Sequence, residues 1–231
     1  MPALALIVFV IAAMRSNLNL GIRHFLLVYP LIALFCGRVF MAWEWRGWKL
    51  GALIVAGVLQ VIGVVRAAPD FLPYLNQAAG GGRNALHYFS DGDYGQDLTL
   101  LGRFARENPG AEMVLSYFGT AVPEYYGINA QYLMPTGAVN RPSRINSPNP
   151  PREFLAVSLS HLQGHMAGES SFEWLRARPP EKIFGGSIYV FDITRDAESH
   201  EKIASLYRLT GETEKAVRHE RRAGVLGHLS Q

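Results

Sequence analysis

The sequence is poor in cysteine and in charge. Cys36 is its single cysteine, so the chain can form neither an internal disulfide framework nor a zinc site built from thiolates. Charged residues make up 18% of the 231 residues, against roughly 25% in an average soluble domain, while apolar residues make up 49%. A single cysteine does not indicate whether the protein works in an oxidising or a reducing compartment. Because charged residues are few, their positions along the chain are informative.

Several common catalytic motifs are also missing. The sequence contains no Gly-x-Ser-x-Gly motif, no P-loop and no Gly-x-Gly-x-x-Gly motif. His161 and His165 are spaced like the histidines of a zinc protease, but Leu162 stands where that motif has Glu, and Gly164 interrupts the helix. The segment DGDYGQD at 91–97 does not match the ligand pattern of an EF-hand loop. No cofactor is therefore expected, and no residue is assigned as a metal ligand.

Asp91 and Asp93 stand two residues apart ahead of a predicted helix. A D-x-D pair can hold a divalent metal against a sugar diphosphate, but aspartates are also ordinary turn residues. Asp93 or Ser90 can equally cap the helix that begins near Gly95. Both interpretations stay open, and no other feature of the sequence supports the metal.

The positive charge is concentrated in the first third of the chain. The pI is 9.1, but residues 1–66 hold six Lys and Arg and one acid, whereas residues 67–231 hold sixteen Lys and Arg and eighteen acids. Because the basic residues flank apolar runs, they are typical of the charges beside membrane segments. We therefore predict contact with membrane lipid and no nucleic-acid partner.

Three apolar runs precede residue 66, at 2–14, 25–43 and 50–65. A membrane-spanning helix needs about 20 mostly apolar residues, and the second run alone approaches that length. Lys49 and Arg66 can extend the third run by snorkelling. The joint WEWRGWK at 43–49 carries three tryptophans, as an interfacial belt does. We predict two to three transmembrane helices over residues 1–66; three buried helices of a globular core are the alternative.

The basic residues also predict an orientation. Arg38, Arg46 and Lys49 lie near the joint between the second and third runs, and Arg15 and Arg23 lie on the other side. By the positive-inside rule this distribution favours a cytoplasmic joint, so the part of the chain after the third run faces outward. The first run has no basic segment ahead of it and does not match a signal peptide. We expect the chain to be the C-terminal part of a longer membrane protein.

The pattern changes after residue 66. Strands are predicted over 112–119, 153–160 and 187–194, and helices over 95–110 and around 170–180. Strands that alternate with helices predict a small soluble α/β domain over residues 67–194.

Residues 195–231 predict a helical hairpin around Thr210 and Gly211, similar to a single tetratricopeptide unit. One such unit cannot bury its apolar face alone, so it must pack on the preceding domain or on a protein partner. The residues predicted to form this face are Ile203, Leu206, Tyr207 and Leu209, opposite Ala216, Val217 and Ala223.

The segment SYFGTAVPEYYG at 116–127 combines three tyrosines with a carboxylate. Aromatic rings stack on the C–H faces of sugars, so Tyr117, Tyr125, Tyr126 and Glu124 are candidate sugar contacts. The alternative is a strand end and turn whose tyrosines belong to the core.

Five stretches occur in this order along the sequence: LNLGIRHFLLVYPLIALFCG, YLNQAAGG, DGDYGQDLTLL, LSYFGTAVPEYYGI and VSLSHLQG. Together they resemble the C-terminal part of bacterial phospholipid-carrier-dependent glycosyltransferases, the protein O-mannosyltransferase-like branch of the multi-spanning GT-C fold. The similarity covers roughly residues 17–194 and leaves out the terminal hairpin.

The resemblance implies transfer of a sugar from a polyprenyl-phosphate carrier to an acceptor at the outer face of the bacterial inner membrane, by a multi-pass protein with a periplasmic C-terminal domain. It also implies that Arg23 and His24 face outward, where an Arg can pair bidentately with the carrier phosphate, while Tyr29 lines the path of the lipid tail. The alternative is that Arg23 snorkels at a helix end without a ligand. The implied acceptor or sugar contacts are Asp91, Asp93, Gln96, Asp97, Tyr117, Glu124, Tyr125 and Tyr126.

The chain departs from that family in two places. The family's acidic catalytic base lies in an outer loop near the N-terminus, and this region has no counterpart in the sequence. No catalytic residue is therefore assigned, and we expect the chain to be inactive alone. The family also tends to have Asn and Trp-Gly where this chain has Gly92 and Tyr94-Gly95, so no precise role follows for Asp91 or Asp93. A non-enzymatic alternative is a membrane-anchored periplasmic module that binds a glycan or a protein.

Overall fold

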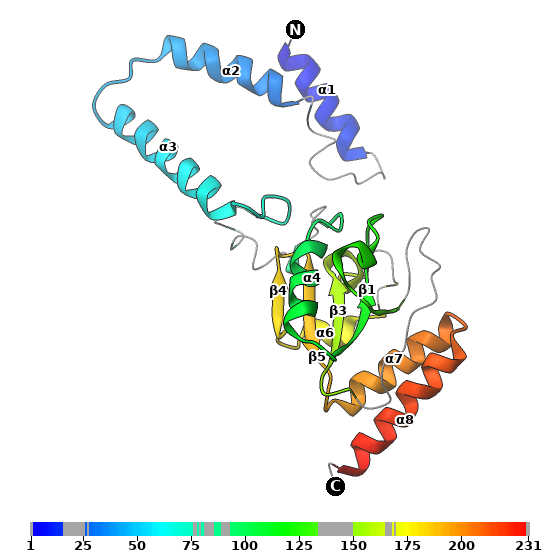
Figure 1. Cartoon of the computed structure of the whole chain (residues 1–231). Helices are drawn as coiled ribbons and strands as arrows, with labels where there is room; N and C mark the ends of the chain where they lie inside the picture. The colour runs from blue at the N-terminus through cyan, green and yellow to red at the C-terminus, as the bar shows by residue number, and fades with distance from the viewer. Residues whose placement is uncertain are drawn as a thin grey trace. The chain divides into compact units, whose positions relative to one another are not determined.

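The chain divides into two compact units, Met1–Arg66 and Ala67–Gln231. The computed structural model, drawn in Figure 1, describes residues 2–15, 26, 28–75, 78, 80, 86–88, 93–133, 150–164, 168 and 170–229. In these residues the first unit consists of helices, and the second consists of a sheet with helices on both faces.

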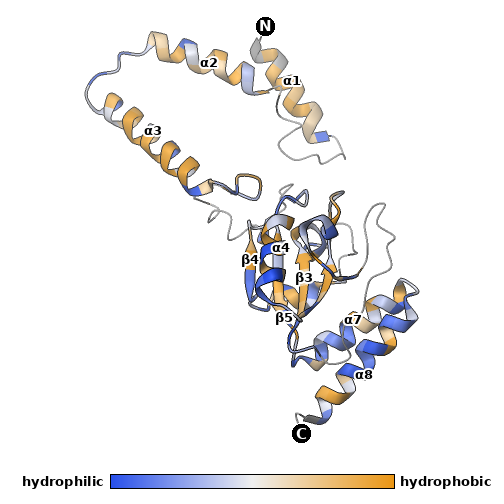
Figure 2. Cartoon of the chain, in the orientation of Figure 1, coloured by the Kyte–Doolittle hydropathy of each residue, from blue (hydrophilic) through white to orange (hydrophobic). Residues whose placement is uncertain are grey.

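The first unit contains three apolar helices, α1 (Pro2–Arg15), α2 (Val28–Ala42) and α3 (Trp48–Ala67), which are coloured mainly as hydrophobic in Figure 2. α3 has 20 residues and so spans about 30 Å, the thickness of the hydrocarbon core of a bilayer. Its apolar side chains are exposed around the helix, as Val58, Leu59 and Val64 on three different sides are by 52%, 56% and 50%. α3 is therefore long and apolar enough to cross a membrane.

The structure reverses the predicted ranking of the second and third apolar runs. α2 has 15 residues and α3 has 20, although we expected the run at 25–43 to be the longer helix. Pro30 explains part of the difference, because it lies in the first turn of α2, where its missing N–H is not needed. α3 instead gains length from Lys49 in its first turn and Arg66 in its last. Of the two to three predicted spans, α3 alone reaches spanning length within the described residues.

The second unit is built around a five-stranded mixed sheet with the strand order β2-β1-β3-β5-β4. β1 is parallel to both β2 and β3, and β5 is antiparallel to both β3 and β4. The predicted small α/β domain is thereby confirmed, while β2 and β4 were not predicted. The strands are β1 (Glu112–Ser116), β2 (Gln131–Tyr132), β3 (Glu153–Ser158), β4 (Lys182–Phe184) and β5 (Ile188–Asp192).

Helices cover both faces of the sheet, because successive side chains of each strand point to opposite faces. In β3, Phe154 and Ala156 pack in the apolar cluster that contains residues of α4, and Leu155 and Val157 pack in the cluster of the opposite face. Figure 1 shows α4 in front of the sheet. The covering helices are α4 (Leu98–Glu107) on one face, and α5 (Leu159–Leu162), α6 (Glu173–Arg176), α7 (Ala197–Leu209) and α8 (Thr213–Leu229) on the other.

α7 and α8 form a hairpin whose apolar side packs on the sheet. Ile203, Tyr207 and Ala216 are fully buried in the cluster that contains β3 and β5 residues. Leu209 and Val217 are 80% and 41% exposed, so the prediction that they belong to the buried face was wrong. At 3.6 residues per turn, Leu209 lies about 200° around α7 from Tyr207, and Val217 lies about 100° from Ala216.

Candidate functional site

Polar side chains gather where two parallel strands end. Ser116 closes β1 and Ser158 closes β3, and the two residues lie at the same edge of the sheet because the strands are parallel. The Oγ of Ser116 lies 2.8 Å from Nδ1 of His161, and the N–H of Phe118 donates to Oγ of Ser158 at 3.1 Å. This edge is where ligands usually bind in open α/β sheets, so we treat it as the candidate site.

Asp93 reaches this edge from the segment that precedes α4, and it is 2% exposed. Its Oδ2 accepts a hydrogen bond from the N–H of Ser160 at 3.1 Å, and its Oδ1 accepts one from the N–H of Gly95 at 3.2 Å. Ser160 lies in the first turn of α5, whose N–H groups have no partner within the helix. Asp93 thus binds an N–H of the first turn of α5, whose N-cap residue is Ser158. The prediction that Asp93 caps the helix near Gly95 was wrong, because Asp97 is the N-cap residue of α4, and Ser90, the other predicted cap, lies outside the described residues.

Asp97 connects the start of α4 to the turn between β4 and β5. Its Oδ2 accepts a hydrogen bond from Oγ of Ser187 at 2.5 Å. The Asp97 carboxylate lies directly against Gly185, where any larger residue would clash. A Cβ atom on Gly185 would lie 2.2 Å from the carboxylate oxygens. Asp97 therefore serves as a buried link between two elements that are far apart in the sequence.

Tyr117 fills the space between two glycines. A Cβ atom would lie 1.8 Å from the Tyr117 hydroxyl if added at Gly95 and 2.2 Å from it if added at Gly119. The hydroxyl donates a hydrogen bond to the carbonyl of Gly95 at 3.4 Å. Burial, with a smaller effect from the nearby Asp93 charge, raises the pKa of Tyr117 to about 12. The ring is therefore a neutral packing element that joins the end of β1 to the Asp93 segment.

The remaining candidate contacts lie on the surface. Glu124 and Tyr125 belong to a short 3-10 helix, η4 (Pro123–Tyr126), and both are exposed, Tyr125 by 88%. Tyr126 is half-buried. Gln96 is exposed, and its Oε1 accepts a hydrogen bond from the N–H of Tyr94 at 2.9 Å. These side chains can touch a soluble ligand, which the buried ones cannot.

The surroundings of the buried cluster disfavour the charged forms of its residues. Burial is the main cause that raises the pKa of both Asp93 and Asp97. Burial also lowers the pKa of His161 to about 4, so its imidazole is neutral near pH 7 and pairs with Ser116 as a hydrogen-bonding partner. Because Ser116 and His161 are fully buried, the cluster acts by fixing the strand ends and not by contact with substrate.

The structure does not bring all predicted site residues together. Arg23, His24 and Asp91 lie outside the described residues. Tyr29 lies in the first turn of α2 and is 49% exposed. In the described part of the chain, no group of three His, Cys, Asp or Glu side chains could hold a metal ion. The metal interpretation of the Asp91 and Asp93 pair therefore stays a hypothesis.

Sequence reasoning missed the serines of this cluster, namely Ser116, Ser158, Ser160 and Ser187. A usable signal was present, since Ser116 and Ser158 each follow a run of apolar strand residues. Comparison of the chain with known protein families, with curated proteins and with solved structures finds no match in any of the three.

Proposed function

We propose that the chain is the membrane-anchored C-terminal portion of a glycosyltransferase that moves a sugar from a polyprenyl-phosphate carrier to an acceptor at the outer face of a membrane. α3 supplies the anchor, with α1 and α2 as further membrane helices. The α/β unit presents the acceptor side of the reaction. The proposal rests on the family resemblance and on the arrangement at the strand ends.

One observation carries the proposal. Three of the five stretches that resemble the glycosyltransferases, at 91–101, 115–128 and 157–164, meet at one edge of the sheet, where Asp93 and Ser160 are bonded although they lie 67 positions apart in the sequence. They meet through buried hydrogen bonds and not only through apolar packing. Ordered polar networks of this kind fix loop geometry, which a site for a hydroxyl-rich substrate requires.

The buried and exposed residues take different roles in this proposal. Asp93, Asp97 and Tyr117 hold the loops, because their polar atoms are already paired with protein groups. The contact with acceptor or sugar falls to exposed side chains, of which Tyr125 offers a free ring face and Glu124 a carboxylate. The proposed contact of Arg23 and His24 with the carrier phosphate rests on the family resemblance alone.

A photo-crosslinking experiment tests the proposal. Membranes that contain the full chain are incubated with polyprenyl-phosphate mannose bearing a photoreactive group in its lipid, and labelling of the chain is measured with and without unlabelled polyprenyl phosphate. We expect labelling that the competitor abolishes and that Arg23→Ala reduces about tenfold, the loss of one charge-assisted contact. Arg15→Ala removes the same charge nearby and should leave labelling unchanged. Equal labelling of the two variants contradicts the proposed phosphate contact.

A non-enzymatic membrane-anchored binding module is the second candidate, and the hairpin favours it. Leu209 is 80% exposed at the end of α7, beside a cavity of about 500 Å³ that Trp174, Lys202 and Leu206 also line. A partner that covers this surface would bury an exposed leucine. This candidate is preferred if the chain shows no competable labelling by the carrier and Leu209→Ser releases a protein or glycan that co-purifies with the wild-type chain.

A further inference from the structure

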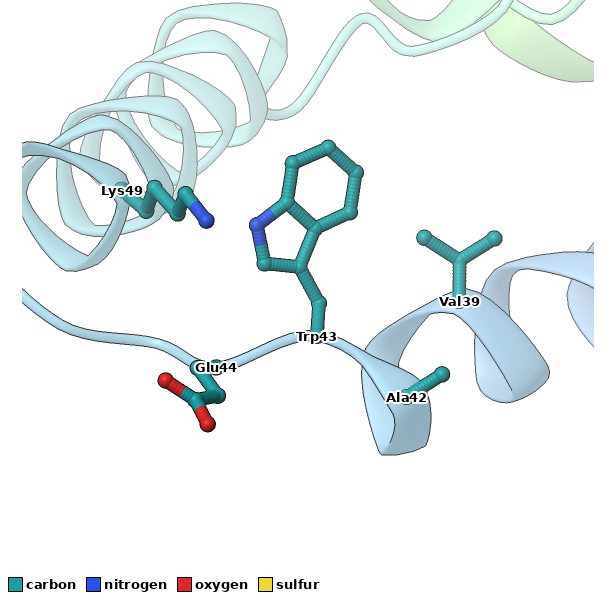
Figure 3. A pocket seen from close by; sticks show the side chains of 5 residues that line it. All are labelled: Val39, Ala42, Trp43, Glu44 and Lys49. Atoms are coloured by element: carbon teal, nitrogen blue, oxygen red, sulfur yellow. The ribbon is translucent and has the colours of Figure 1, made fainter.

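A cavity lies at the joint between α2 and α3, in a part of the chain that the proposed sugar transfer does not use. Its volume is about 530 Å³. It is lined by Val39, Ala42, Trp43, Glu44 and Lys49, which Figure 3 shows from close by. The lining therefore combines an apolar wall at the end of α2 with an indole, one carboxylate and one ammonium group.

Aromatic contacts hold the joint in shape. The indole N–H of Trp45 donates a hydrogen bond to the carbonyl of Phe40 at 2.9 Å, and the two rings lie 4.9 Å apart. The Trp43 ring stacks on Trp45 with 6.1 Å between centroids. These contacts fix the direction of the Trp43 ring, so one wall of the cavity is built before any ligand arrives.

Two hydrogen-bond donors converge in the cavity. Figure 3 shows the indole nitrogen of Trp43 and the ammonium nitrogen of Lys49 turned toward one another, and Lys49 Nζ lies over the Trp43 ring in a cation–π contact, 5.2 Å from the ring centroid. Within the described residues neither nitrogen has an acceptor, and the Glu44 carboxylate has no cationic partner. The cavity thus offers two donors to an anion and, separately, one carboxylate to a cation.

We propose that this cavity binds a membrane phospholipid with an amino headgroup. The phosphate lies between the Trp43 indole N–H and the Lys49 ammonium, the headgroup amine pairs with Glu44, and the acyl chains leave along Val39 and Ala42. Phosphatidylethanolamine has this chemistry, whereas phosphatidylglycerol has the phosphate but no amine. The cavity opens at the first turn of α3, which lies at headgroup level when α3 crosses a bilayer.

The inference depends on the membrane anchor in the proposed function but not on sugar transfer. Its test uses the full chain, purified in detergent and titrated with dioleoyl phosphatidylethanolamine or dioleoyl phosphatidylglycerol, with bound lipid counted by native mass spectrometry. We expect tighter binding of phosphatidylethanolamine. Lys49→Gln should weaken both lipids about tenfold, because it removes a charge-assisted contact to the shared phosphate. Glu44→Gln should remove the preference between the lipids and leave the phosphate contact.

Arg66→Gln is the matched control, since it removes the same charge from the other end of α3. It should change neither affinity nor preference. Equal effects of Lys49→Gln and Arg66→Gln overturn the inference, as does a wild-type chain that binds phosphatidylglycerol at least as tightly. Flotation of the chain with lipid vesicles tests the membrane anchor separately from the lipid site. A chain that does not float overturns both the anchor and the lipid site, whereas a chain that floats without the Lys49 effect overturns the lipid site alone.

Discussion

His200 and His219 join the two helices of the hairpin through a buried contact between their Nδ1 atoms, 2.8 Å apart. Nε2 of His200 lies 3.1 Å from the carbonyl of Ile193, which can only accept, so this nitrogen carries the proton. One of the two Nδ1 atoms donates to the other, so the two rings form a hydrogen-bonded pair. Nε2 of His219 has no hydrogen-bond partner within the described residues. This buried nitrogen has nothing to donate a proton to, which fits a neutral His219 imidazole.

The first prediction is that the hairpin loses stability in acid. Burial, with smaller effects from His200 and Arg218, lowers the pKa of His219 to about 3, against 6.5 for an ordinary histidine. The unfolded chain therefore binds a proton as pH falls below 6.5, while the folded chain binds it only near pH 3. His219 should therefore lower the free energy of unfolding by about 1.4 kcal/mol for each pH unit within that window and change nothing above it.

Hydrogen exchange of the α8 amides, corrected for the intrinsic effect of pH, measures this loss. His219→Leu should reduce protection at pH 7.5, because His200 loses its partner, but should flatten the decline between pH 6.5 and pH 5. His161, whose pKa is also lowered by burial, should likewise reduce the stability in acid. The comparison of wild type with His219→Leu isolates the effect of His219, because His161 is present in both. His228→Leu, an exposed change on the same helix, should behave as wild type. If α8 protection in His219→Leu declines with falling pH as steeply as in wild type, the histidine pair is not the cause of the acid sensitivity.

The sequence predicted the centre of the fold better than its periphery. β1, β3 and β5 each contain a run of apolar residues long enough to show a strand pattern, and the structure has all three strands with these residues buried. β2 and β4 have only two and three residues, too few for a pattern to appear, and they form by pairing with β1 and β5. Strand pairing is a tertiary effect, which explains why these short edge strands were missed.

The candidate site was predictable only in part, for a related reason. Asp93, Asp97 and Tyr117 stand out by residue type, but what they do depends on partners far along the chain. Asp97 meets Ser187 across 90 residues, and Asp93 meets Ser160 across 67. No local pattern carries that information. The sequence therefore singled out the segments that contain these residues but assigned Asp93 to the cap of the wrong helix.

The second prediction concerns the ion pairs that fasten α8 to the sheet. Nε of Arg222 lies 2.7 Å from Oε2 of Glu153, a carboxylate that is 6% exposed at the start of β3. Arg222→Met should destabilise the unit by about 3–5 kcal/mol, because it removes the guanidinium that pairs with a buried carboxylate and leaves, among the described residues, only His200 Nε2, 3.6 Å away. Arg208→Met is the control, since the pair of Arg208 with Glu220 is exposed to solvent and contributes little. Thermal unfolding of the two variants should differ clearly, and similar melting temperatures would contradict the structural role of Arg222.

The third prediction separates a steric clash from backbone strain. Gly95 and Gly110 both have positive φ, +77° and +81°, so Ala costs about 1–2 kcal/mol at either position for the backbone alone. A Cβ atom at Gly95 would also lie 1.8 Å from the Tyr117 hydroxyl, whereas at Gly110 its nearest neighbour is 3.8 Å away. Gly95→Ala should therefore be clearly more destabilising than Gly110→Ala in thermal unfolding. Adding Tyr117→Phe should recover part of the stability lost in Gly95→Ala but none of that lost in Gly110→Ala. If Gly95→Ala and Gly110→Ala lose the same stability, Tyr117 is not packed tightly against Gly95.

The fourth prediction uses the single cysteine to test whether α2 enters the membrane. Cys36 lies exposed on α2, at 15 residues a helix too short to span a bilayer without its flanks. If lipid surrounds α2, an impermeant maleimide cannot reach the thiol. We expect no labelling of Cys36 in intact cells and full labelling after detergent. Ser205→Cys in a Cys36→Ser chain, on the exposed face of α7, should react in intact cells when the α/β unit faces outward. Labelling of Cys36 before detergent would take α2 out of the membrane and leave α3 as the anchor, while protection of the residue 205 thiol would reverse the orientation.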